Sequence, residues 1–225
     1  MGLLADCAAV ADAGGTPLGI ATALTAQGRT FQVRPVAQRL LKAQLTEAIS
    51  FRRPSAVKLG LVPDARTLAT LWPGLTALHV PLVVDPVVRT SKGERLSRLG
   101  PKGFLALAGP NVWLTPNVGE LGWLLGRKAL PRGPKEVQAL ASQLLALGFA
   151  AVVVKGGHLA GRPVDFLVQP GGVHRWAARR LPRTAEKRGK GCRFASTLAT
   201  ALAQGQPPAA AVRRARGAVR RYLLG

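Results

Sequence analysis

Short, continuous apolar runs separated by helix-like segments are the feature that most constrains the fold of this chain. Four such runs read as strands, at residues 55–60, 79–84, 112–115 and 150–154. Strands that are apolar along their whole length are buried on both faces, and the helical segments between them supply the covering layers. The pattern therefore predicts an α/β fold with a mostly parallel central sheet and helices on both faces.

The segments between and after these strands predict covering helices and one hairpin. Residues 134–147 begin with proline, carry their apolar residues on one helical face and are followed by glycine, which is typical of a complete helix. Residues 166–176 place a Pro-Gly-Gly turn between two apolar runs and predict a hairpin. Residues 194–202 and 209–224 read as two further helices, and we expect residues 1–225 to form a single α/β domain.

Polar residues stand at the ends of the predicted strands or shortly after them. In a parallel sheet the carboxyl ends of the strands meet at one edge, and ligands bind there. A structural reading stays open for three of these residues: Asp85 can cap a strand end, Glu120 can favour a helix dipole from the first turn, and Lys155 can be a solvated cation. Together they predict one polar site formed by Asp85, Asn117, Glu120, Lys155 and His158.

A glycine-rich loop precedes the first of the two C-terminal helices. Gly189 and Gly191 let the backbone turn tightly, and the unpaired amides at the helix start point at the turn, so the segment can hold an anion, most often a phosphate. Cys192 would stand at the positive end of the helix dipole among basic neighbours that include Lys190 and Arg193, which favours its thiolate. Burial in the core is the alternative reading of this cysteine.

The chain is strongly basic, with 32 Lys and Arg residues against 10 Asp and Glu residues and a net charge of +22. Such a charge attracts polyanions, and Arg213, Arg216 and Arg220 share one face of the last helix, where they repel one another unless an anion binds among them. The sequence has no zinc spacing or nucleic-acid-reading motif, so nucleic acid would bind nonspecifically through its phosphates. A solvated basic surface without such a partner is the other reading.

Cysteine content and hydropathy indicate the compartment. The cysteines Cys7 and Cys192 lie far apart in sequence, and the start of the chain has no secretion signal, so we expect a reduced, cytoplasmic protein. Cys7 lies in an apolar, helix-like stretch and reads as a core residue. No uncharged apolar window reaches about 18 residues, so we expect no membrane span and no membrane partner.

The motifs occur in an order that resembles the hydroxymethylpyrimidine/phosphomethylpyrimidine kinases, thiamine-pathway enzymes of the ribokinase-like fold. Each motif alone has low specificity, but the set extends over almost the whole chain in the order and spacing of that family. The motifs are Thr25-Ala26-Gln27, Ala56-Val57-Lys58-Leu59-Gly60, Val84-Asp85-Pro86-Val87, Leu114-Thr115-Pro116-Asn117 with Glu120, Val154-Lys155-Gly156-Gly157-His158, and Gly189-Lys190-Gly191-Cys192.

The resemblance implies that ATP phosphorylates the hydroxymethyl group of a pyrimidine and then the resulting monophosphate, with Mg²⁺ at the phosphates, and that the protein is a homodimer. In this family the cysteine stands where other ribokinase-like enzymes place a catalytic aspartate. The implied site residues are, for the pyrimidine, Gln27, Lys58 and Val87; for the nucleotide, Asn117, Lys155, Gly157 and His158; for Mg²⁺, Asp85 and Glu120; and for phosphoryl transfer, Gly189, Lys190, Gly191 and Cys192.

The chain departs from the family pattern at its start and in the glycine loop. The family's first strand and Gly-x-Asp-x-Ser-Gly-Gly-Ala-Gly segment help to form the substrate pocket, whereas this sequence starts at Met1-Gly2, where that segment ends, so we expect a central strand and part of the pocket to be missing. Gly28 and Val88 stand where the family has asparagine and methionine, and residues 187–193 carry cations in place of hydroxyl and imidazole groups. A catalytically weakened kinase-fold protein that holds a phosphorylated ligand or nucleic acid is therefore the second hypothesis, and pyridoxal-type substrates also stay open.

Overall fold

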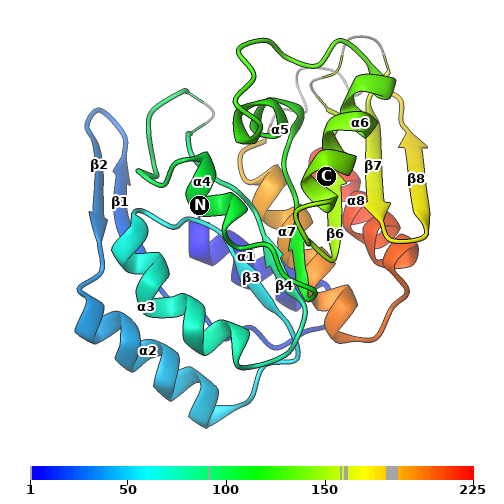
Figure 1. The fold of residues 1–225 in the computed structure, drawn as a ribbon. Coiled ribbons are helices and arrows are strands. Elements are labelled where there is room, and N and C mark those ends of the chain that lie inside the picture. Colours follow the sequence, from blue (N-terminus) through cyan, green and yellow to red (C-terminus); the bar gives the residue numbers. More distant parts are fainter. Residues whose placement is uncertain (1, 91, 158, 160–161, 181–186) are drawn as a thin grey trace.

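A six-stranded sheet forms the centre of the computed structural model, which describes residues 2–90, 92–157, 159, 162–180 and 187–225 (Figure 1). The strands follow one another across the sheet in chain order. The first four pair in parallel and the last two are antiparallel, so the predicted mostly parallel sheet is confirmed. The strands are β3 (Val57–Leu59), β4 (Leu82–Val84), β5 (Val112–Leu114), β6 (Ala151–Val154), β7 (Val164–Gln169) and β8 (Gly172–Ala177).

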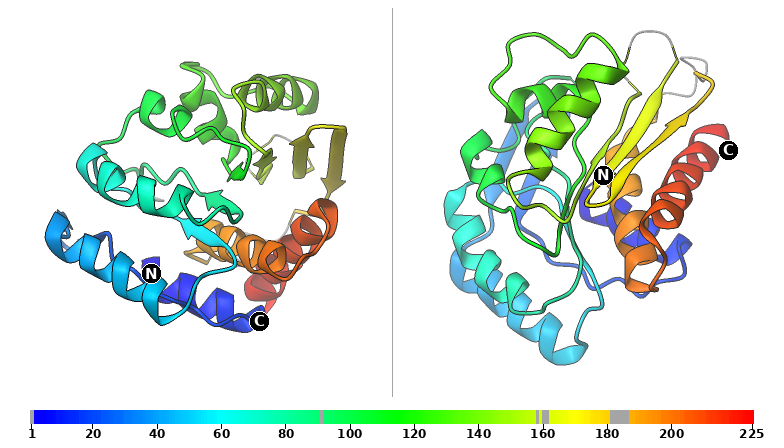
Figure 2. Two further views of the ribbon diagram at one scale, coloured as in Figure 1. Left: turned by 60° about the horizontal axis from the view of Figure 1, so that its bottom comes forward. Right: turned by 45° about the vertical axis from the view of Figure 1, so that its right-hand side comes forward.

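Helices cover both faces of this sheet. One layer holds α1 (Gly2–Asp12), α7 (Lys190–Ala203) and α8 (Pro208–Leu224), which gather on one side of the sheet in Figure 2. The other layer holds α3 (Ala65–Thr76), α4 (Pro101–Leu105), α5 (Val118–Leu124) and α6 (Pro134–Leu145), and α2 (Gln38–Phe51) packs against α3. The helices predicted at 134–147, 194–202 and 209–224 are confirmed with small changes in their bounds.

Successive residues of the inner strands face opposite layers, as the two-residue period of a strand requires. Val83 and Val153 pack with buried residues of α7 and α8, whereas Val84 and Val154 join the cluster formed with α3 and α6. All four side chains are fully buried. The two covered faces explain why these strands are apolar at every position.

Two strands lie outside this sheet. β1 (Ala23–Gln27) and β2 (Phe31–Pro35) form a separate antiparallel hairpin that projects from the body in Figure 1, and the sequence analysis does not predict it. β3 is the edge strand on the same side of the molecule, and among the described residues it pairs only with β4. None of the helices in the described part of the chain has the length and apolar character needed to cross a bilayer.

Gly156 and Gly157 offer a matched test of the turn that follows β6. A Cβ atom at Gly156 would overlap the backbone carbonyl of Val164, whereas one at Gly157 would meet no atom within 4 Å. We expect Gly156→Ala to lower the free energy of unfolding by about 3 kcal/mol or more, because the backbone must move to accept the methyl group. Gly157→Ala should change it by less than about 0.5 kcal/mol. Urea unfolding of the two variants measures this difference, and equal stabilities would contradict the described turn.

Candidate functional site

A large cavity of about 2630 Å³ extends from the carboxyl ends of the parallel strands along the edge strand β3. A single small-molecule ligand commonly needs a pocket of about 300–1,000 Å³, so the cavity has room for a nucleotide and a second molecule. Every predicted site residue that the structure describes lines it, and His158 lies outside the described residues. The lining residues from the prediction are Gln27, Lys58, Asp85, Val87, Asn117, Glu120, Lys155, Gly157, Gly189, Lys190, Gly191 and Cys192.

The N-terminus of α7 opens onto this cavity. Gly189 has φ 84°, a left-handed conformation that glycine adopts without strain, and the first backbone bond of the helix runs from the Arg193 amide to the Gly189 carbonyl at 2.9 Å. The amides of residues 190–192 therefore have no acceptor within the helix. A Cβ on Gly191 would lie 3.4 Å from Asp85 Oδ2 and 3.5 Å from Lys155 Nζ, so the backbone lies directly against these two side chains.

Asp85 and Lys155 form a buried ion pair beneath the start of α7. Lys155 Nζ lies 2.7 Å from Asp85 Oδ1, and the two side chains are 17% and 3% exposed. Asp85 follows β4 and Lys155 follows β6, on either side of β5, so the sheet fixes their separation. Burial lowers the pKa of Lys155, but the Asp85 and Glu120 carboxylates outweigh this and raise it, so Lys155 keeps its charge.

Asn117 and Glu120 begin helix α5 as a reciprocal cap. The Asn117 side chain accepts a hydrogen bond from the Glu120 backbone amide at 2.9 Å. In return, Glu120 Oε2 accepts one from the Asn117 backbone amide at 2.7 Å. The structural reading of Glu120 as a helix-start acid is therefore correct, although its carboxyl group also lines the cavity. Burial, together with the nearby Asp85 charge, raises the pKa of Glu120 to about 7, against the opposing effect of Lys155.

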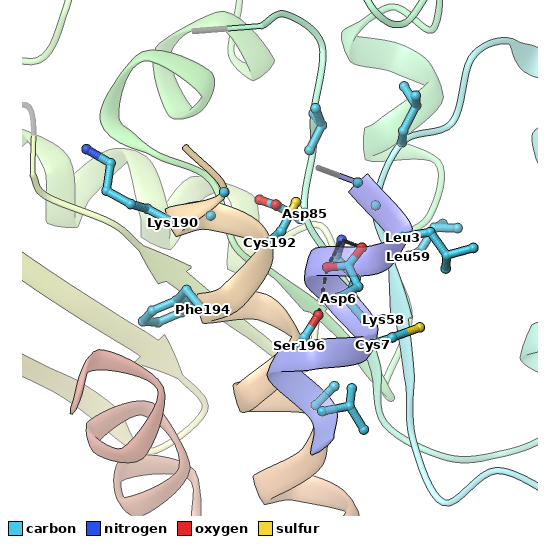
Figure 3. Close-up of a pocket in the computed structure, with 18 of the residues that line it drawn as sticks. Leu3, Asp6, Cys7, Lys58, Leu59, Asp85, Lys190, Cys192, Phe194 and Ser196 are labelled. Atoms are coloured by element: carbon cyan, nitrogen blue, oxygen red, sulfur yellow. Dashed lines mark hydrogen bonds and ion pairs between the residues drawn. The ribbon is translucent and has the colours of Figure 1, made fainter. Parts of the chain in front are cut away.

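Two residues that hold Lys58 in place, Asp6 and Ser196, were not predicted from the sequence. Lys58 Nζ donates to both carboxylate oxygens of Asp6 on α1 at 2.8 Å, and the Ser196 hydroxyl on α7 donates to Asp6 Oδ1 at 2.8 Å (Figure 3). Gly60 leaves the space that the Lys58 ammonium occupies, since a Cβ there would overlap it. The one sequence signal was the carboxylate of Asp6 within the otherwise apolar run of residues 3–10.

The predicted thiolate of Cys192 is wrong. Burial raises the pKa of Cys192 above its ordinary value of 9.0, and although Lys58 opposes this, Asp6 and Asp85 raise it further. The basic neighbours do not act as expected, because Lys190 extends away from Cys192 in Figure 3 and Arg193 pairs with Asp12 at 2.6 Å. Cys192 is therefore a thiol at neutral pH.

The remaining predicted residues lie around this centre. Gln27 is exposed at the end of β1, where its side-chain amide donates to the Thr25 hydroxyl at 3.2 Å. Val87 is half-buried, and Gly157 is exposed after β6. Cys7, read from sequence as a core residue, is half-buried and lines the cavity.

The arginines expected on one face of α8 have different surroundings. Arg216 pairs with Asp165 at 2.7 Å and packs on Trp176, whereas Arg213 and Arg220 are exposed. Neutralisation of Arg216 removes part of the mutual repulsion from which the sequence argued for a bound polyanion. A nucleic-acid partner stays a prediction.

The parallel sheet and the helix N-terminus over paired charged residues at its carboxyl edge define an α/β kinase of the ribokinase-like class. A phosphomethylpyrimidine kinase from Clostridium difficile superimposes with a TM-score of 0.81, covering 98% of this chain and 92% of that one at 25% identity. A Staphylococcus aureus pyridoxal kinase in complex with AMP-PCP has a TM-score of 0.85 at 22% identity, covering 97% of this chain and 81% of that one.

The chain belongs to the phosphomethylpyrimidine kinase family, whose model matches residues 1–224. It is 32% identical to a hydroxymethylpyrimidine/phosphomethylpyrimidine kinase from Rhizobium meliloti, over 96% of this chain and 82% of the relative. It is 35% identical to the thiamine biosynthesis multifunctional protein ThiED from Corynebacterium efficiens, over 92% of this chain but only 28% of that longer protein. The resemblance inferred from the motifs is therefore confirmed.

The coupling of Lys155 to Glu120 gives a measurable prediction. Lys155→Met should raise the pKa of Glu120 above about 7, because it removes the cation that favours the carboxylate. NMR titration of ¹³C-labelled glutamate carboxyl groups measures this pKa. Arg127→Met is the control, because Arg127 pairs with Glu136 outside the cavity and should leave the Glu120 titration unchanged. A Glu120 pKa that stays the same or falls in Lys155→Met would contradict the described cluster.

The same pKa predicts how Glu120 affects stability. Its pKa in the folded protein exceeds the ordinary value of 4.5, so the folded state binds this proton more tightly than the unfolded state. The contribution of protonated Glu120 to the free energy of unfolding is therefore complete below pH 4.5 and is lost as the pH rises through about 7.

Proposed function

We propose that this protein transfers the γ-phosphoryl group of ATP to the hydroxymethyl group of a pyrimidine, and then to the monophosphate that results. The observation that carries the proposal is the start of α7, whose free amides lie against the Asp85–Lys155 pair in a cavity with room for two ligands. Phosphoryl transfer depends on positioning and on charge stabilisation more than on covalent catalysis. Family membership supplies the substrate class.

The backbone of the glycine loop holds the phosphoryl group in this proposal. Amides of residues 190–192 donate to its oxygens, and the partial positive charge of the helix N-terminus stabilises the charge that develops there. Lys58 and Lys155 are buried cations that line the cavity, and each is held by an aspartate. Because both are held in place before a ligand binds, little rearrangement is needed to neutralise the transferred group.

Asp85 and Glu120 are the proposed protein ligands of Mg²⁺. No group of three or more His, Cys, Asp or Glu side chains suited to a metal ion occurs in the described ranges. Two carboxylates nevertheless fit Mg²⁺, which commonly takes one or two carboxylates together with substrate phosphates and water. When bound, the ion would neutralise phosphate charge. Glu120 must lose its proton to act as a ligand, so its raised pKa makes binding weaker below pH 7.

The two ends of the cavity take different ligands in this proposal. Asn117, Lys155, Gly157 and His158 bind the nucleotide, and Gln27, Lys58 and Val87 contact the pyrimidine. The residues proposed to bind the nucleotide lie at or after the carboxyl ends of the strands, which is the usual position of a ligand in such sheets.

Cys192 is the proposed acceptor of the substrate hydroxyl proton. As a thiol in the resting enzyme, it must first be deprotonated, so only a small fraction of the enzyme is active at neutral pH. Lys58 has the largest effect among the charges that lower the pKa of Cys192 and so favours its thiolate.

The binding-protein hypothesis is not favoured. It rested on the expected loss of the N-terminal substrate segment and on cations in the glycine loop. Of these cations, Arg193 pairs with Asp12 and stacks on Tyr222, and Lys190 points away from Cys192. A cytoplasmic location and a homodimer stay predictions, and light scattering of the purified protein would test the dimer.

A coupled assay for ADP with hydroxymethylpyrimidine, ATP and Mg²⁺ tests the proposal. We expect turnover that requires all three, with less from pyridoxal. Asp85→Asn should lower kcat by about 100-fold or more, because it removes one preorganised charge from the site. Glu47→Gln removes an exposed carboxylate on α2 and should leave kcat unchanged. Absence of ADP above the enzyme-free rate would overturn the proposal, and faster turnover of pyridoxal would change its substrate.

The pH profile tests the role of Cys192. If its thiolate accepts the proton, kcat/KM should rise about tenfold per pH unit up to the raised pKa of Cys192, above pH 9.0. Cys192→Ser should lose this alkaline rise, because serine does not ionise in that range. Parallel profiles for the two proteins would show that another group takes the proton.

A further inference from the structure

A second cavity, of about 450 Å³, lies between the end of α1, the first two turns of α7, and α8. It has no lining residue in common with the large cavity. Three guanidinium groups line it, those of Arg193, Arg214 and Arg221, and its one carboxylate is Asp12. The cavity is therefore cationic and separate from the site proposed for phosphoryl transfer.

Thr197, which lines this cavity, has a buried hydroxyl without a partner among the described residues. Thr197 on α7 is 2% exposed, and its Oγ1 makes no hydrogen bond with any described residue. A threonine inside a helix commonly donates to the carbonyl four residues earlier, as Thr200 of the same helix does to Ser196 at 2.9 Å. Leaving such a group unpaired costs about 1–3 kcal/mol. A hydrogen-bonding ligand in the cavity would remove this cost.

The arginines of the cavity differ in how many donors they have left. Both terminal nitrogens of Arg214 already donate to protein groups, one to the Gln204 side chain and the other to the Ala13 carbonyl just after the end of α1. Arg193 uses one terminal nitrogen for Asp12 and packs its plane on Tyr222. Arg221 is exposed, and its side chain has no hydrogen bond or ion pair with a described residue. Arg193 and Arg221 therefore keep guanidinium donors for a ligand.

We propose that this cavity binds a phosphate-type oxyanion through Arg193, Arg221 and the Thr197 hydroxyl. Guanidinium groups hold tetrahedral oxyanions through paired, charge-assisted hydrogen bonds, and a hydroxyl donates one more. Arg214 adds positive charge without a direct bond, and Asp12 limits affinity by competing for Arg193. The ligand class is inorganic phosphate or a phosphate monoester.

Titration with inorganic phosphate, followed at the methyl group of Thr197 by ¹H–¹³C NMR, tests the proposal at the cavity itself. Thr197→Val identifies the resonance, because its signal disappears in that variant. We expect a saturable shift with sodium phosphate and none with sodium chloride at equal ionic strength. Arg221→Gln should weaken the apparent affinity by about tenfold or more, the loss of a hydrogen bond between charged groups.

Arg39→Gln is the matched control, because Arg39 is an exposed arginine on α2 that lines neither cavity. It should titrate like the unmodified protein. No saturable shift, an equal shift with chloride, or equal affinities for Arg221→Gln and Arg39→Gln would overturn the proposal. These readouts do not depend on kinase activity, so failure of the proposed function would leave them unchanged.

Thr197→Val gives a second measurement in the same cavity. In phosphate-free buffer its melting temperature should equal or exceed that of the unmodified protein, because it loses only an unpaired hydroxyl. Phosphate should then stabilise it less than it stabilises the unmodified protein. A lower melting temperature without phosphate would show that the hydroxyl already has a structural role, and would contradict the proposal.

Discussion

The contact between the backbone at Gly191 and the buried Asp85–Lys155 pair determines what this site can do. A Cβ atom at position 191 would be in van der Waals contact with both members of the pair, so the start of α7 lies directly against them. The pair itself is 2.7 Å long and almost fully buried, so its two charges compensate each other where water cannot. An anion that binds these amides therefore lies beside Lys155, whose position the ion pair with Asp85 already fixes.

A second buried ion pair of this kind also acts on Cys192. Lys58 is bound by Asp6, which Ser196 also contacts, so α1, β3 and α7 are tied together at one point. Both lysines have raised pKa values because nearby acidic groups outweigh the effect of burial. These groups are Cys192, Asp6 and Asp85 for Lys58, and Asp85 and Glu120 for Lys155. The same aspartates contribute to the raised pKa of Cys192. Burial, together with these aspartates, therefore keeps the resting thiol protonated.

The sheet and most of the site could be predicted from the sequence because their signals are local. The apolar run of β6 ends at Lys155, and the glycines around Lys190 mark the start of α7. The Asp6–Lys58 bond joins residues 52 positions apart, and the Asp6–Ser196 bond joins residues 190 apart, so neither leaves a local pattern. The state of Cys192 depended on where the side chains of Lys190 and Arg193 point, which composition does not reveal. The β1–β2 hairpin is largely exposed and carries little apolar periodicity.

A crystal structure with AMP-PCP, Mg²⁺ and hydroxymethylpyrimidine would test the central claim most directly. The account predicts oxygens of the γ-phosphoryl group at about 2.7–3.2 Å from amide nitrogens within residues 190–192, with Lys155 beside them. A γ-phosphoryl group bound elsewhere in the cavity, with those amides left to water or to other protein groups, would contradict it.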